Sequence, residues 1–158
     1  MFRSTAILCL VLAAPAQAQQ ASHASPAQPY AGQQDRAIKA LSADDIAELR
    51  RGGGWGMAKA AELNGMPGPA HLLQMKDEIG LSPDQVARIE VIHARMQQDA
   101  IAEGDRLIAA EAVLEAAFRD RTVTDESLQV MLDGIESIRV RLRYVHPSPH
   151  LSTPALLS

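Results

Sequence analysis

Five side chains in this sequence have the types and the spacing to bind a transition metal. His71 and Met75 are four residues apart, and Glu90, His93 and Met96 follow one another at intervals of three. On a helix, these intervals place the side chains on one face. Imidazole, thioether and carboxylate groups together suit copper, nickel, cobalt or zinc. If the two helices fold back on each other, the five side chains predict a site for one of these metals.

The same histidines and methionines also have a simpler interpretation as parts of a helical core. A lone histidine on a helix is more often structural than a ligand, and the sequence does not show which group would orient each imidazole. His146 and His150 are four residues apart as well, but Pro147 and Pro149 are expected to break the helix that would align them. Metal binding and core packing therefore stay open as alternatives.

A second set of side chains suits the binding of polypeptide. Methionine repacks readily against varied partners, so a methionine-containing apolar stripe fits a surface that holds unfolded proteins. The predicted contact residues are Leu72, Met75, Ile89, Ile92 and Met96. By spacing alone, an ordinary core or a dimer interface is the favoured interpretation of these residues, because most helical stripes are core.

Enzymes and nucleic-acid-binding proteins are disfavoured. The sequence contains no Gly-x-Ser-x-Gly, no His-Glu-x-x-His and no phosphate-binding loop, so we expect no catalytic residues and no required cofactor. The formal net charge is −4, and there is no basic patch to bind nucleic acid. Aromatic residues are only 3% of the chain, which gives little support to a conventional small-molecule pocket.

The N-terminus has the pattern of a secretory signal peptide over residues 1–18. A short basic start at Arg3 precedes an apolar run, and Ala16-Gln17-Ala18 has the form of a signal-peptidase site. The run is too short to span a bilayer, so we expect cleavage and export to a bacterial periplasm, with no transmembrane anchor. Cys9, the only cysteine, would leave with the signal, and the mature chain would have no disulfide or thiolate site.

Composition divides the remaining chain into three parts. Residues 19–33 are rich in Gln, Ala, Ser and Pro and are predicted to be a disordered arm. Residues 34–145 carry helical patterns and form the predicted domain. Residues 146–158 contain no Asp, Glu, Lys or Arg, and their prolines predict an irregular, loose tail, which we interpret as a truncation or a change of reading frame.

Capping residues and apolar spacing predict the helices of the domain. Short helices are expected over 42–50, 57–63 and 69–79. Ser82, Pro83 and Gln85 form a capping-box start for a long helix to about residue 121, in which Gly104 is a candidate bend or close-approach point. Thr124 is expected to cap the next helix.

The helix after Thr124 carries the most regular apolar pattern in the chain. Its seam residues are spaced 3, 4, 3, 4 and 3 apart: Leu128, Met131, Ile135, Ile138, Leu142 and Val145. Such a seam, after a short turn, predicts an antiparallel hairpin with the preceding helix. Counting back from the turn, Leu128 should meet Phe118, Met131 should meet Leu114, and Ile138 should approach Leu107.

The two arms of this hairpin differ in length. They would measure about 57 Å and 32 Å at 1.5 Å per residue. The stripe from Val86 to Met96 would therefore have no partner in the hairpin. Either the third helix, folded back through a left-handed Gly80, or a second copy of the chain would have to cover it.

The ordered set of motifs resembles the Spy/CpxP family of periplasmic proteins, also called LTxxQ-motif proteins. The resemblance is carried by the signal peptide, by Leu81-Ser82-Pro83-Asp84-Gln85 and by the helical hairpin that follows. Three further blocks contribute: Tyr30-Ala31-Gly32-Gln33-Gln34, Ile38-Lys39-Ala40-Leu41-Ser42 and Asn64-Gly65-Met66-Pro67-Gly68-Pro69-Ala70-His71. The chain departs from the family at its end, where Leu151-Ser152-Thr153-Pro154 lacks the glutamine of a second motif.

The resemblance implies an all-α fold, often a dimeric cradle, and a function without enzymatic activity. It implies an ATP-independent chaperone or envelope-stress adaptor whose partners are unfolded periplasmic proteins or a membrane signalling protein. A related branch of the family senses heavy metals, which implies the alternative of a periplasmic metal sensor or resistance protein. A homodimer is expected in either case.

Overall fold

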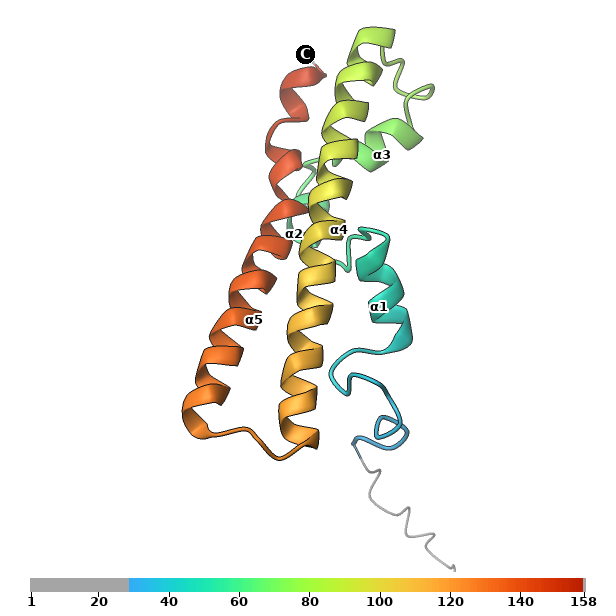
Figure 1. Ribbon diagram of the computed structural model, residues 1–158. Coiled ribbons are helices and arrows are strands. Elements are labelled where there is room, and N and C mark those ends of the chain that lie inside the picture. Colours follow the sequence, from blue (N-terminus) through green and yellow to red (C-terminus); the bar gives the residue numbers. More distant parts are fainter. Residues whose placement is uncertain (1–28, 158) are drawn as a thin grey trace, which may run out of the picture. The chain divides into compact units, whose positions relative to one another are not determined.

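The computed structural model describes residues 29–157, and its helices all belong to one unit, Gly32–Ser158 (Figure 1). No strand occurs among the described residues, so this part of the chain is all-helical as expected. The predicted signal peptide and most of the predicted arm lie outside the described residues. The elements are α1 (Ala43–Arg50), α2 (Lys59–Glu62), α3 (Pro69–Gln74), α4 (Pro83–Arg119), α5 (Asp125–Val145) and the 3₁₀-helices η1 (Ser148–Leu151) and η2 (Pro154–Leu156).

Three capping boxes fix where α1, α4 and α5 begin. The hydroxyls of Ser42, Ser82 and Thr124 each accept a hydrogen bond from the backbone N–H three residues later. The side chain at that third position bonds back to the cap, as Gln85 does to the Ser82 N–H at 2.9 Å. Reciprocal capping satisfies two backbone donors that the first turn leaves unpaired. The predicted starts of these three helices are therefore confirmed.

The short helices α2 and α3 are shorter than predicted. α3 ends at Gln74, and the chain continues through turns to Gly80, whose φ of +67° places it in the predicted left-handed conformation. Residues 74–80 are all exposed, so no tertiary packing supports the extra helical turn. A short helix without packing is marginal in water.

α4 and α5 lie side by side in a hairpin-like arrangement, joined by the turn at residues 120–124. Ile135 and Leu142 of α5 are buried in one cluster with Leu107 of α4, and Ile138 and Leu114 pack against the same cluster. Phe118, at the end nearest the turn, is 54% exposed. The apolar seam is thus well packed in its middle and open towards the turn.

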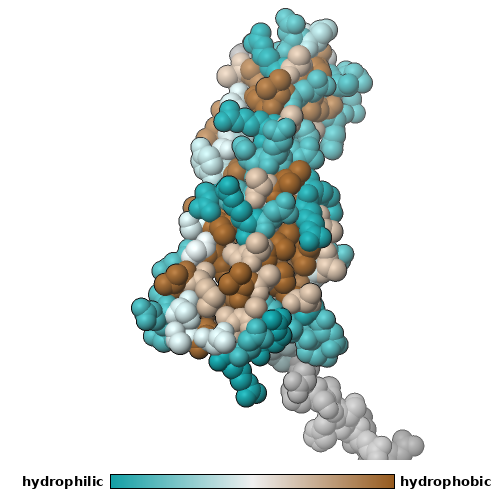
Figure 2. Space-filling model, viewed as in Figure 1, coloured by the Kyte–Doolittle hydropathy of each residue, from teal (hydrophilic) through white to brown (hydrophobic). Residues whose placement is uncertain are grey.

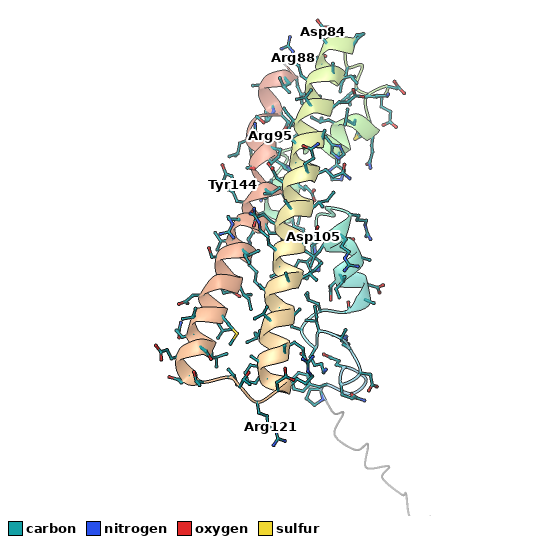
Figure 3. All side chains as sticks on the ribbon, in the orientation of Figure 1. Asp84, Arg88, Arg95, Asp105, Arg121 and Tyr144 are labelled. Carbon is teal, nitrogen blue, oxygen red and sulfur yellow. The ribbon has the colours of Figure 1, made fainter. Side chains whose placement is uncertain are left out.

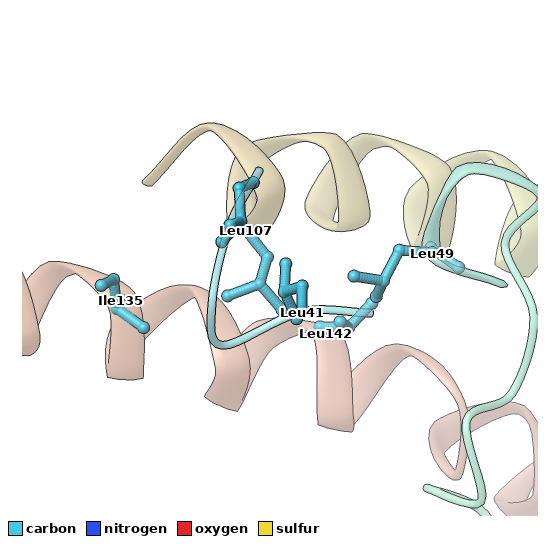
Figure 4. Packing of buried hydrophobic residues seen from close by; sticks show 7 residues of the cluster. Leu41, Leu49, Leu107, Ile135 and Leu142 are labelled. Carbon is cyan, nitrogen blue, oxygen red and sulfur yellow. The ribbon is translucent and has the colours of Figure 1, made fainter. Parts of the chain in front are cut away.

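The N-terminal part of the unit completes this core. Leu41, Leu49 and Leu107 are almost fully buried, and Figure 4 shows them together with Ile135 and Leu142. α1 approaches α4 closely, because a Cβ built on Gly104 would lie 2.7 Å from the backbone oxygen of Leu49. Gly104 is therefore a close-approach point, one of its two predicted roles.

Polar contacts hold α5 against α4 and tie the loop after α1 back to α1. Two mostly buried glutamates of α4 pair with arginines of α5: Glu103 with Arg141 at 3.1 Å and Glu111 with Arg139 at 2.5 Å. The Trp55 indole N–H donates to Asp45 of α1 at 3.0 Å. Hydrogen bonds from Ser42 hold the pKa of the Asp45 carboxyl below its usual range, so Asp45 stays ionised as cap and acceptor.

The stripe from Val86 to Met96 is partly covered within the chain. α3 packs on α4, as the first predicted alternative requires, and η1 and η2 pack on it as well. Ile89 has no exposed surface. The expectation of a loose tail is wrong, because His146, His150 and Thr153 are buried and Gln85 of α4 donates to the Leu156 carbonyl at 2.8 Å. Uncharged residues carry little desolvation cost, and the prolines end α5 without preventing a packed 3₁₀ turn.

Among residues 29–157, the helices include none with the length and apolar character required to cross a membrane.

The contact at Gly104 gives a stability prediction. Gly104→Ala should destabilise the protein by about 1–3 kcal/mol, because the added methyl group meets backbone that cannot move away without shifting α1. Gly134→Ala in α5 is the matched control, since a Cβ there meets nothing within 4 Å and the gain in helix propensity is up to about 1 kcal/mol. Urea denaturation measures both. Equal stability of the two variants would contradict the close packing of α1 on α4.

Candidate functional site: a histidine-lined cavity and apolar grooves

Four histidines line one cavity of about 330 Å³ between α3, α4, the C-terminal segment and the part of the chain over residues 51–62. They are His71, His93, His146 and His150, and the thioether of Met96 lines the cavity with them. The chain has five histidines, and the fifth, His23, lies outside the described residues. Residues more than 70 positions apart thus contribute to one site.

Each histidine is positioned by a different local feature. His71 lies on α3, with Nδ1 3.7 Å from a Glu62 carboxylate oxygen. His93 lies on α4, three residues before Met96. His146 is the C-cap of α5, and the turn through Pro147 and Pro149 brings His150 to the cavity in η1.

The His150 ring is clamped to the loop before α3. Its Nδ1 lies 2.8 Å from the Met66 carbonyl, and a carbonyl oxygen only accepts, so Nδ1 carries the hydrogen. In the neutral ring, Nε2 then carries the unshared pair. The ring lies directly against Gly68, where a Cβ would come within 2.5 Å of Nε2. Thr153 fixes the same segment by donating to the Pro67 carbonyl at 2.5 Å.

His146 is buried without a complete set of partners. It is 3% exposed, and its Nε2 is buried with no hydrogen-bond partner. Burial lowers the pKa of His146, and the proximity of His150 lowers it further. The ring is therefore neutral near pH 7 and has an unshared pair on one nitrogen.

The structure brings together only part of the predicted metal-binding set. His71, His93 and Met96 line the cavity, whereas Met75 lines a groove elsewhere and Glu90 is exposed on α4 outside the cavity lining. The sequence interpretation set His146 and His150 aside because of the prolines, and the structure places both in the cavity. Within residues 29–157, no group of three or more His, Cys, Asp or Glu side chains is arranged to hold a metal ion as it stands.

Two apolar grooves lie beside the first half of α4. The first, of about 420 Å³, is lined mainly by Leu72, Met75, Ile79 and Leu81, together with Leu157 from the C-terminal end. Most of its lining comes from the connection between α3 and α4. The groove is therefore formed by the turns that stand where the sequence predicted the end of the third helix.

The second groove, of about 290 Å³, lies between α4 and the end of α5. Ile92 and Met96 line it from α4, and Tyr144 and Val145 line it from α5. A further hollow of about 480 Å³ shares Asp99, Tyr144 and Val145 with it and so extends it along the two helices. Figure 3 shows Arg95 and Tyr144 on the two sides of this groove, and in the same view Figure 2 shows apolar and charged side chains interspersed.

Four of the five predicted contact residues line these grooves. Leu72 and Met75 belong to the first, and Ile92 and Met96 belong to the second. Ile89 is fully buried, so its prediction as a surface contact is wrong. The sequence analysis did not predict Tyr144 as a contact residue. An aromatic residue outside the regular apolar seam of its helix was a signal that could have identified it.

No family model, curated protein or solved structure matches the chain. The resemblance to the Spy/CpxP family therefore stays a prediction.

The contact between Gly68 and His150 is testable. Gly68→Ala should displace the imidazole and loosen the C-terminal segment, because the new methyl group would occupy the position of the ring. We expect amide hydrogen exchange over residues 146–157 to increase, with a loss of about 1–3 kcal/mol in stability.

Gly54→Ala is the control for this substitution, because a Cβ at that position meets nothing within 4 Å and its φ is not in the left-handed region. Unchanged exchange over residues 146–157 in Gly68→Ala would show that His150 does not hold the segment.

Proposed function

We propose that this protein is an exported, periplasmic, ATP-independent chaperone or envelope-stress adaptor that binds apolar segments of unfolded or partner proteins. The observation that carries the proposal is the pair of apolar grooves beside the first half of α4, which contain Leu72, Met75, Ile92 and Met96. These residues were predicted from the sequence as a polypeptide-binding stripe. The proposal includes no catalytic step.

The size of the grooves favours extended chain as the occupant. Volumes of about 290 to 480 Å³ lie at the lower end of those of small-ligand pockets, so each hollow accepts a few side chains. An unfolded protein presents such side chains on a flexible backbone.

The chemistry of the lining favours tolerance of sequence. Met75 and Met96 supply thioether side chains that adapt to different partners. The second groove has both Arg95 and Asp99 at its edge, so neither sign of charge is selected. Promiscuous binders commonly use adaptable surfaces of this kind.

We include a homodimer in the proposal, although the stripe from Val86 to Met96, which suggested a second copy, is partly covered within the chain. Its interface would use the outer faces of the two long helices, where Val113 of α4 and Val130 of α5 are exposed. Exposed apolar side chains on the surface of helices can mark a contact with another protein. Sedimentation equilibrium of residues 19–158 measures the association.

Aggregation assays test the binding of unfolded protein. Metal-free residues 19–158, at several-fold molar excess, should suppress the light scattering of a reduced, unfolded client. Met75→Asp and Ile92→Asp should weaken suppression several-fold, because each places a charge that must be desolvated in an apolar groove.

Val91→Asp provides the matched control. Val91 lies on the same helix as Ile92, is 70% exposed, and is not in the lining of either groove. It should suppress aggregation as the unchanged protein does. Absence of suppression by the unchanged protein, or equal loss in all three variants, would contradict the proposed function.

A further inference from the structure

We propose that the histidine-lined cavity binds one copper(I) ion through His146, His150 and Met96, with His93 completing the set. Met96, the thioether donor, and His93, the fourth ligand, belong to the five residues predicted from the sequence. The other two ligands are histidines of the C-terminal segment, which take the place of His71, Met75 and Glu90.

The strongest observation is the unpartnered nitrogen of His146. Its Nε2 is buried and makes no hydrogen bond, which leaves a polar atom without compensation for its lost hydration. Such atoms are rare in folded proteins and call for an explanation. A metal ion at this nitrogen supplies the missing partner.

His150 has the hydrogen-bonding arrangement that is typical of a metal ligand. Histidine ligands usually donate their second ring nitrogen to a carbonyl or carboxylate, which fixes the tautomer and the ring orientation. The Nδ1–H of His150 donates in this way to the Met66 carbonyl. The opposite nitrogen, Nε2, is the one left to bind a metal.

The donor chemistry selects the metal. The cavity offers imidazoles and a thioether, and soft thioether ligands favour copper(I). Glu62 is the only carboxylate in its lining, and it lies beside His71 at the edge of the set. Calcium and magnesium, which require several oxygen ligands, are therefore unsuited to it.

The charge of the ion also favours copper(I). The donors in this set are all neutral, so the ion keeps its full charge inside a partly buried cavity. A monovalent ion has a smaller desolvation cost there than a divalent one. The guanidinium of Arg51, which also lines the cavity, is paired with Glu48.

Binding requires side-chain rotation within the cavity. No group of three or more His, Cys, Asp or Glu side chains in the described part of the chain is already placed around one point. His93 is half-buried on α4 and Met96 has flexible torsions, so both can turn towards the His146–His150 pair. The thioether then supplies the third donor.

Competition with a chromophoric copper(I) chelator tests the proposal. Untagged residues 19–158, which exclude Cys9, are titrated with copper(I) kept reduced by ascorbate in the presence of bicinchoninate. The protein should retain one equivalent of copper. Met96→Leu and His93→Gln should each lower the affinity about tenfold or more, because each removes a donor. X-ray absorption should show both nitrogen and sulfur around the copper.

Met75→Leu is the matched control, since it removes a methionine that lines the first groove and not the cavity. Its affinity should equal that of the unchanged protein, and circular dichroism should show that all variants are folded. Failure to retain copper, or equal loss in Met75→Leu and Met96→Leu, would overturn the site. Because aggregation suppression is measured without metal, the outcome of the copper titration neither supports nor contradicts the proposed function.

Discussion

The unequal lengths of the two long helices determine the rest of this structure. α4 has 37 residues and α5 has 21, which correspond to about 55 Å and 32 Å of helix. α5 therefore covers only the second half of the apolar face of α4. The first half, around Ile89, must be buried by other segments, because an apolar stripe of that size is costly to expose.

Two segments that flank the long helices provide the missing cover, and the places where they meet form the candidate sites. α3 approaches from before α4, and η1 and η2 approach from after α5. Because neither is long enough to cover α4 completely, apolar grooves remain beside it. Because both carry histidines, the histidine-lined cavity lies at their junction. The proposed peptide binding and the proposed copper site are thus consequences of the same incomplete cover.

Local chemistry explains which features could be predicted from the sequence. Caps such as Ser82 bond to residues three positions away, so a short stretch of sequence is enough to predict them. The regular seam through Ile135 and Leu142 identified the packed face of α5 in the same way. The C-terminal segment was different. Its prolines correctly indicated the end of α5, but its docking depends on Met66 and Pro67, more than 80 residues earlier. No local pattern encodes such a contact, and for that reason the pairing of His146 with His150 in one cavity was missed.

The central claim is that the C-terminal segment covers the first half of α4. Hydrogen exchange of a variant ending at Val145, compared with the full chain, tests it most directly. We predict that amides of residues 86–96 lose protection in the shortened variant, while those of residues 100–119, packed against α1 and α5, keep theirs. Unchanged protection of residues 86–96 would show that the segment does not cover α4 and would contradict the account.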